Sequence, residues 1–143
     1  MPFTFKQLTD AEKEEFLKNN FWGILSFAGD EPYALPIGYG YKKGAITMGF
    51  AISGRKGEYV KRSRNVCFTI CTPAKVASDS NQGEAYPFTT VMIEGELRDM
   101  TDAERESFGY PPARGGGTFG LFILEPKRVG TQVMGFEGAV PKF

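Results

Sequence analysis

The feature that most constrains the fold is a series of short apolar segments separated by turn residues, which runs from residue 22 to residue 129. Each segment is rich in β-branched and aromatic residues and is bounded by Gly, Pro, Asp or Asn, which is typical of strands. The expected strands are 22–28, 33–41, 45–50, 65–71, 88–100 and 117–129. Short strands with close turns predict a mainly β, antiparallel barrel or sandwich, and 143 residues predict a single domain over 1–143.

The sequence Thr-Asp-Ala-Glu occurs twice, at Thr9 and at Thr101, and predicts the starts of two helices. A Thr at the cap with a Glu three residues later forms a capping box. The flanking residues of the two copies differ, so they indicate one cap used twice rather than an internal repeat. A third short helix is expected at 54–63, and two loops are expected at 74–87 and 111–117. Substrate contacts would come from loops such as 74–87 and from the tail after residue 129.

The overall charge is balanced, with 17 basic and 17 acidic residues, which argues against wholesale binding of nucleic acid or membrane. No apolar run approaches the length of a transmembrane helix, and residues 1–20 are too polar for a signal peptide. We therefore expect a cytoplasmic protein.

Histidine is absent, so the commonest general base and metal ligand is missing and no metal site is expected. Any catalysis would rely on a bound cofactor for the chemistry. Cys67 and Cys71 would lie roughly 13 Å apart on one strand, too far for a disulfide, and are expected to be small buried residues. Glu94 and Glu96, two residues apart on a strand, are expected to be solvated.

In the strand expected at 33–41, one face carries large apolar residues while Pro36, Gly38 and Gly40 leave the other face nearly bare. Glycine inside a strand often marks a bulge or the close approach of a ligand or a backbone. The sequence leaves both readings open, a barrel corner or a surface for a flat ligand or a partner chain.

The basic stretch around Gly54, Arg55 and Lys56 could hold a phosphate. Gly49 and Gly54 nearly complete a P-loop, but the Ser or Thr that binds magnesium is missing and the surroundings lack a βαβ pattern, which excludes an NTPase. On spacing alone a solvated turn is the simpler reading. An anion site is favoured by a helix that begins near Ser53, where free N–H groups and the helix dipole attract negative charge, and by the fork of Arg55.

In order and spacing, residues 24–70 resemble the FMN-binding split-barrel family related to pyridoxamine 5′-phosphate oxidase. The resemblance rests on the strand with Pro36, the following hairpin, Gly54-Arg55-Lys56, the basic pair Lys61-Arg62, and Asn65-Val66-Cys67-Phe68. Residues 89–106 resemble a later segment of the same family, and the nitroimidazole-reductase-like branch is nearest. The resemblance covers roughly residues 5–128 and implies a split β-barrel of Greek-key type with a few short helices.

The resemblance implies a homodimer with FMN at the subunit interface. By analogy Arg55 and Lys56 hold the phosphate, with help from Ser53. The residues expected near the flavin ring are Pro36, Ile37, Gly38, Met48, Gly49, Phe50 and Ala51, and those expected from the partner chain are Thr89 and Thr90.

The activity implied is that of an FMN-dependent oxidoreductase acting on a small molecule, with NAD(P)H one candidate reductant. The alternatives are a flavin carrier or sensor without turnover, a split barrel that binds the deazaflavin F420 or haem, and a non-enzymatic module for phosphorylated ligands. The lack of His weighs against haem. Gly49 stands where the nitroimidazole-reductase-like branch often has His, which argues against a mechanism that uses that residue and opens space beside the flavin.

Overall fold

The computed structural model of the chain describes residues 3–73, 88–112 and 117–136. The helices are α1 (Asp10–Asn19), α2 (Gly54–Arg62) and α3 (Asp102–Phe108). The strands are β1 (Phe3–Lys6), β2 (Trp22–Phe27), β3 (Tyr33–Gly38), β4 (Gly40–Lys42), β5 (Ala45–Ala51), β6 (Asn65–Pro73), β7 (Phe88–Asp99) and β8 (Phe119–Phe136). The loop expected at 74–87 lies outside the described residues, as does most of the loop expected at 111–117.

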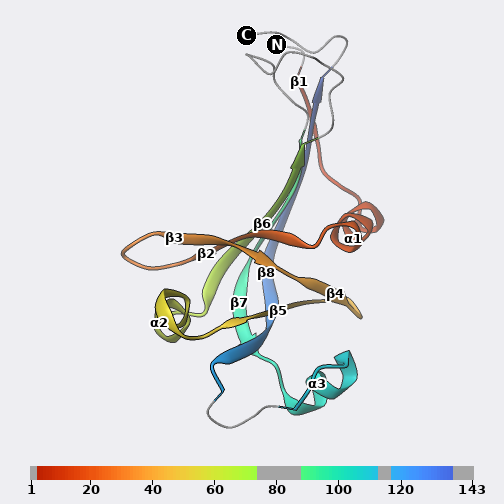
Figure 1. Cartoon of the computed structure of the whole chain (residues 1–143). Helices are drawn as coiled ribbons and strands as arrows, with labels where there is room; N and C mark the ends of the chain where they lie inside the picture. The colour runs from red at the N-terminus through yellow and green to blue at the C-terminus, as the bar shows by residue number, and fades with distance from the viewer. Residues whose placement is uncertain (1–2, 74–87, 113–116, 137–143) are drawn as a thin grey trace, which may run out of the picture.

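The sheet curls into a barrel because of how its end strands are connected (Figure 1). Its strands run in the order β3-β2-β6-β7-β8-β5-β4, with β1 also paired to β8, and every pair is antiparallel. β3 and β4 lie at opposite ends of this order, yet only Tyr39 separates them in the chain. The two ends must therefore come together, and the predicted antiparallel split-barrel fold is confirmed.

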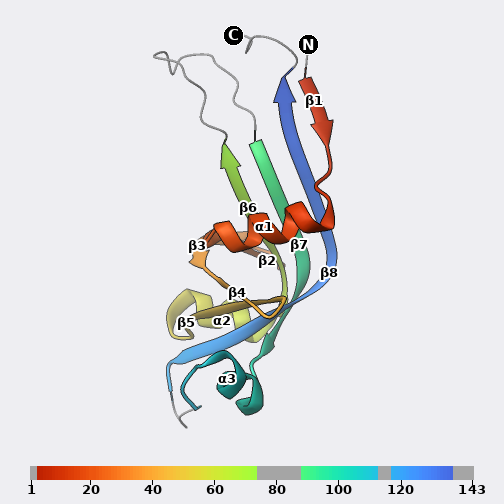
Figure 2. The same ribbon diagram turned by 90° about the vertical axis from the view of Figure 1, so that its right-hand side faces the viewer.

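Three strands continue beyond the barrel as an extended arm. β6, β7 and β8 run upward together in Figure 1, where β1 pairs with the last part of β8. In both views α3 lies at the end of the molecule away from this arm (Figure 2). The part of the sheet that forms the arm therefore lies far from α3.

The chain breaks between β3 and β4 at Tyr39, where a single strand was expected. The Tyr39 amide donates to the Phe21 carbonyl at 2.9 Å instead of joining a ladder. Its buried hydroxyl donates to the Leu17 carbonyl at 2.7 Å, near the end of α1. Tyr39 thus fixes the barrel corner to α1, which sequence alternation alone could not indicate.

The core lies inside the barrel and is built from alternate residues of most of the strands. Its buried members are Leu17, Leu25, Phe27, Ile37, Tyr39, Ile46, Met48, Phe50, Tyr59, Val60, Val66, Phe68, Ile70, Val91, Ile93, Leu97, Phe122 and Leu124. A second, smaller cluster of Met100, Leu121 and Ile123 lies on the other side of the β5–β8 ladder, covered by Phe108 and Tyr110. The sheet therefore has packed residues on both faces at the α3 end.

Both predicted capping boxes are present. Thr9 and Thr101 each accept from the backbone of a Glu three residues on, and that Glu accepts from the Thr backbone. α3 ends where expected, at Gly109 with φ 79°, a left-handed conformation that favours glycine. Across the parts of the chain that the structure describes, every helix is too short or too polar to pass through a bilayer.

The sequence did not indicate β1, and it ended β8 too early, at residue 129. β1 has four residues, and its partners Val133 to Phe136 lie some 130 positions further along the chain. Neither segment has a clear period of its own. Their strand conformation comes from ladder pairing with each other and with β7.

The expectation that both cysteines are buried is wrong. Both are free thiols; Cys67 is partly buried and Cys71 is exposed, where its Sγ accepts from the Thr90 hydroxyl at 3.3 Å. The reason is strand alternation: on β6 the residues Val66, Phe68 and Ile70 point into the core, so Cys67 and Cys71, at the alternate positions, face outward.

Candidate functional site

The N-terminal end of α2 lacks the cap that the other two helices have. Ser53 occupies the cap position, but its hydroxyl makes no capping hydrogen bond, and the first turn holds no acidic residue. The first N–H groups of a helix have no partner within the helix, and they carry partial positive charge. An anion at this end would supply the acceptor that Thr9 and Thr101 supply to α1 and α3.

Gly54 shapes this helix end through its backbone. Its φ is 73°, and a Cβ placed on it would meet no atom within 4 Å. Conformation rather than lack of space therefore requires glycine here. A left-handed residue beside right-handed ones turns successive N–H groups toward a common point, an arrangement that binds anions.

Arg55 is held over an aromatic platform beside this end. Its guanidinium carbon lies 5.1 Å from the ring centre of Tyr33 and 5.7 Å from that of Tyr59, and the two rings stack at 4.6 Å. Its ion pair with Glu31 is long, at 3.9 Å, and the Arg55 side chain is 57% exposed, so the pair contributes little. The platform restricts the guanidinium while leaving it able to bind another anion.

Close packing against β5 sets the position of α2. Gly57 is buried, and a Cβ on it would overlap the Ile52 carbonyl group. Only glycine lets the first turn of α2 approach the end of β5 this closely. Lys56, partly exposed, follows Arg55 in the same turn and adds a second positive charge.

One face of the sheet is open and carries exposed apolar side chains. The strand registers place Pro36, Ile24, Thr69, Met92 and Gly130 in one row across five strands. Ile24 and Met92 are exposed, and so is Trp22 two residues from Ile24, at 51%. The β2–β3 ladder is regular through Pro36 as far as its last pair, Trp22 with Gly38, so no bulge explains these two residues. The bare face is a continuation of this open surface.

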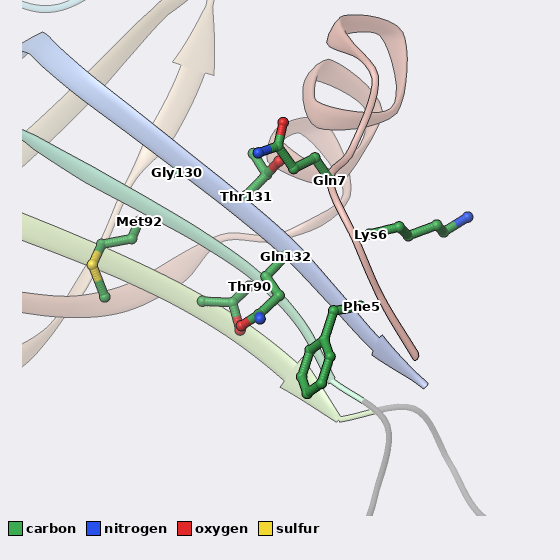
Figure 3. Close-up of a pocket in the computed structure, with 8 residues that line it drawn as sticks. All are labelled: Phe5, Lys6, Gln7, Thr90, Met92, Gly130, Thr131 and Gln132. Carbon is green, nitrogen blue, oxygen red and sulfur yellow. The ribbon is translucent and has the colours of Figure 1, made fainter. Parts of the chain in front are cut away.

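A groove of about 560 Å³ lies on the same open face, on the arm (Figure 3). Thr90 and Gln132, paired across β7 and β8, lie beside Phe5 at its centre, and Met92 lies at one end (Figure 3). The groove combines hydroxyl and amide groups with an aromatic ring and a thioether. Of the two threonines expected to approach from a partner chain, Thr90 lines it.

The predicted phosphate site and the predicted partner residues are separated within one chain. Glu96 of β7 pairs with Asn65, three residues after the end of α2. Thr90 lies six residues from Glu96, about 20 Å along β7 toward the arm, and both views show α2 beside the barrel and away from the arm (Figures 1 and 2). One chain therefore does not bring the two groups together, whereas Ser53, Arg55 and Lys56 do lie together.

The predicted ring contacts fall on two sides of β5. Met48 and Phe50, like Ile37 of β3, are buried in the main core, so only their backbone atoms could face a ligand. Gly49 and Ala51 point to the opposite side, toward the smaller cluster, where Gly49 pairs with Leu121. Pro36 and Gly38 are exposed on the open sheet face.

Sequence reasoning missed the Tyr33–Tyr59 platform and the exposed Trp22. Tyr59 follows Arg55 by four residues, which is the spacing of neighbours on one helix face and could have indicated the contact. Tyr33 and Trp22 offered no such signal, because their positions depend on the pairing of β2, β3 and β6.

The largest pKa shifts belong to residues away from α2. Burial raises the pKa of Tyr39 to about 12. The hydrogen bonds from Arg98 and from the Thr101 backbone lower the pKa of Glu104 to about 2.

Within the described ranges no three His, Cys, Asp or Glu side chains gather to hold a metal ion. Glu94 and Glu96 form ion pairs with Arg128 and Lys127 across the β7–β8 ladder.

Solved structures with this fold include flavin-binding proteins. A FAD-binding protein from Mesorhizobium loti matches with a TM-score of 0.63 and 17% identity, over 93% of this chain and 99% of that one. A candidate 5-nitroimidazole antibiotic resistance protein from Bacteroides thetaiotaomicron matches at 0.69 and 15%, over 95% and 91%. A FAD and haem binding protein from Mycobacterium smegmatis matches at 0.71 and 9%, over 100% and 77%.

At these low identities the structural matches establish a shared fold and nothing more. Membership of a family is shown by the sequence. Among curated proteins none matches this chain by sequence. Residues 9–108 match the model of the family described as pyridoxamine 5′-phosphate oxidase, and they include β2 to β6, α1 to α3 and the basic turn at Gly54. The chain belongs to this family.

Proposed function

We propose that the protein binds FMN and is an FMN-dependent oxidoreductase that acts on a small molecule as a homodimer. The phosphate would lie at the N-terminal end of α2, and the flavin ring would lie between two protomers. The observation that carries the proposal is the uncapped end of α2, where Gly54 turns N–H groups outward beside Arg55 and Lys56.

The physical argument for a phosphate is that the N-terminal end of α2 is electrostatically unfavourable without a bound anion. Two cations in the first turn oppose the helix dipole, and Ser53 offers no compensating cap. Natural helices usually satisfy these N–H groups, as α1 and α3 do in this chain. A bound phosphate would reverse both penalties, because it accepts from the N–H groups and pairs with the cations.

The open sheet face supports a dimer. Trp22, Ile24 and Met92 leave apolar area exposed on one continuous surface, and such surfaces commonly mark an interface. A second copy packed on this face would bring its own arm groove, with Thr90 and Gln132, to the first copy. That arrangement would supply the ring contacts that one chain cannot place near its own α2.

Bound FMN would supply the transfer of a hydride or of single electrons. The residues of the chain would bind and orient it: Arg55 and Lys56 at the phosphate, and the outward-facing backbone of β3 at the ring. The covered sheet face would exclude water from the ring. No His is present, so proton delivery by that side chain has no part in the mechanism.

The test of FMN binding is a visible spectrum of the purified protein, followed by titration of the flavin-free protein with FMN. We expect an Arg55→Ala variant to bind FMN about 10- to 100-fold more weakly, as for loss of a charged hydrogen bond. Arg62→Ala is the matched control, because Arg62 also lies over the Tyr59 ring but at the other end of α2. Absence of FMN binding would sink the proposal. Tighter binding of FAD than of FMN would mean that the cofactor is FAD, and it would leave the proposed binding site unchanged.

The test of the dimer is sedimentation velocity of a Met92→Lys variant. We expect it to shift the protein toward monomer and to weaken FMN binding, because Met92 lies on the open face. Val129→Lys is the control, since Val129 is also exposed on the same pair of strands but pairs with the core residue Ile93 and so lies on the opposite face. Equal effects of the two substitutions would contradict the proposed interface.

Turnover separates an enzyme from a flavin carrier or sensor. FMN-loaded protein would be reduced anaerobically with NADH or NADPH and then mixed with small electron acceptors. Repeated reoxidation by an acceptor would support the oxidoreductase, and loading without turnover would favour a carrier.

A further inference from the structure

A second cavity, separate from the arm groove and the α2 end, lies where β5 and β8 meet the segment after α3. Its volume is about 420 Å³, within the range of small-molecule pockets. Its walls are largely apolar, formed by Phe119, Leu121, Tyr110 and Pro111. No residue of the arm groove contributes to it.

Gly49 forms the floor of this cavity. A Cβ at this position would lie 2.9 Å from Leu121 Cδ2 and 3.0 Å from Phe119 Cε1, so the Phe119 ring lies over the glycine. Gly49 is exposed, whereas Thr47 two residues earlier on the same face is buried. The Phe119 ring takes the place that a side chain at Gly49 would need, and Phe119, 60% exposed, presents an aromatic surface to the cavity.

The opposite wall is rigid. The Tyr110 hydroxyl lies 3.1 Å from the Thr47 hydroxyl, and the Lys42 ammonium lies 4.2 Å from the centre of the Tyr110 ring. Pro111 follows directly. A wall held by these contacts does not collapse into the empty cavity. Ligand binding therefore costs little free energy for ordering this wall.

Arg105 is the charged residue that lines the cavity, and its donors are incompletely used. Its Nη1 donates to the Pro111 carbonyl at 3.3 Å, while its Nε is buried and finds no hydrogen-bond partner within the described residues. No described carboxylate lies within 4.0 Å of it, in contrast to Arg98, which binds Glu104 and Glu125. A planar guanidinium with no carboxylate partner among the described residues can bind a carboxylate through its terminal Nη groups.

We propose that this cavity binds a small planar carboxylate, an aromatic or conjugated acid of one or two rings. The ring would stack on Phe119 above Gly49, and the carboxylate would accept from Arg105. Arg105 is the one cation among the lining residues that the structure describes, and a single cation beside apolar walls suits a monoanion, whereas a phosphate dianion would be left short of donors. Such an acid is the substrate class that the structure favours for this protein.

The cavity adjoins the proposed flavin site along β5, and its lining residue Gly49 is itself one of the predicted ring contacts. The Ile52 amide donates to the carbonyl of Thr118, a lining residue, at 2.7 Å, and Ile52 directly precedes Ser53 at the α2 cap. Phe119 pairs with Ala51, one of the predicted ring contacts. The role of the acid as substrate rests on the proposed function, but its binding does not.

The test is titration calorimetry of the full chain, without and with FMN, using 2-naphthoate and its neutral analogue 2-naphthamide. We expect naphthoate to bind about tenfold more tightly than the amide, and Arg105→Gln to abolish that preference. Gly49→Val, whose side chain would collide with the Phe119 ring and displace it, should block both ligands. Arg62→Gln is the control for a lost surface cation and should change neither.

Equal affinity for naphthoate and naphthamide, or an Arg105→Gln variant with unchanged naphthoate affinity, would overturn the proposal. Thermal unfolding of each variant, compared with the parent protein, shows whether it has folded. If FMN binds and naphthoate does not, the cavity proposal fails while the flavin proposal stands. If naphthoate binds through Arg105 and FMN does not bind, the carboxylate site stands and the oxidoreductase fails.

Discussion

Replacing Gly57 by Ala tests whether close packing of α2 on β5 sets the site. In an open helix this substitution would stabilise the protein by about 0.5–1 kcal/mol, because Ala has the higher helix propensity. In this structure the added Cβ would lie 2.5 Å from the Ile52 carbonyl carbon and closer still to its oxygen. Carbon atoms in contact prefer about 3.5–4.0 Å, so the helix would have to move by roughly 1–1.5 Å.

The two effects have opposite signs, and the steric one should win. Overpacking typically costs about 1–3 kcal/mol, and the obstructing atoms are backbone, which places the cost at the upper end. After the propensity gain the expected net loss is about 2 kcal/mol. For a chain of this size that corresponds to a fall in Tm of about 6–8 °C.

The assay is chemical and thermal unfolding together with FMN titration. Gly29→Ala is the matched control, because its nearest contact would be an ordinary 3.8 Å, and we expect its stability to change by less than about 0.5 kcal/mol. The displaced helix should also bind FMN more weakly, since its first N–H groups move. A Gly57→Ala variant as stable as the parent protein would refute the packing explanation of this glycine.

The remaining predictions concern two titratable residues away from the site. Tyr39→Phe should lower stability by about 1–2 kcal/mol, because the buried Leu17 carbonyl loses its donor. The raised pKa of Tyr39, about 12, means that its contribution is present below pH 10 and lost as the pH rises toward 12, which tyrosinate absorbance and unfolding at each pH would check. Glu104→Gln keeps a capping residue but loses the charge paired with Arg98, and should cost about 1–2 kcal/mol at pH 7 after allowance for partial exposure. Since the pKa of Glu104 is lowered to about 2, the difference between variant and parent should shrink as the pH falls from about 4.5 to 2, and a constant difference would contradict this.

The sequence predicted those elements whose signals are local. The capping boxes at Thr9 and Thr101, the glycine stop at Gly109 and the alternation of β3 each depend on a few adjacent residues, and the structure has all of them. β1 and the last third of β8 could not be found this way. They become strands through pairing with each other at a separation of some 130 residues.

In the candidate site, too, only the features with a local signal could be predicted from the sequence. The basic turn at Gly54 could be read from residue types, and the structure adds the left-handed glycine and the missing cap. The cavity over Gly49 could not be predicted from residue types, because Arg105, Tyr110 and Phe119 reach it from separate parts of the chain. The resemblance pointed to Gly49 by a missing side chain, but only packing reveals what lies above it.

Trp22 on the open face has a consequence for how the protein can be observed. It is the single tryptophan of the chain, so all indole fluorescence comes from one position on that face. Indole emission shifts to shorter wavelength when water leaves the ring, and a flavin nearby absorbs in the range where indole emits. Assembly and flavin uptake would therefore report separately, as a shift and as a loss of intensity, in unlabelled wild-type protein.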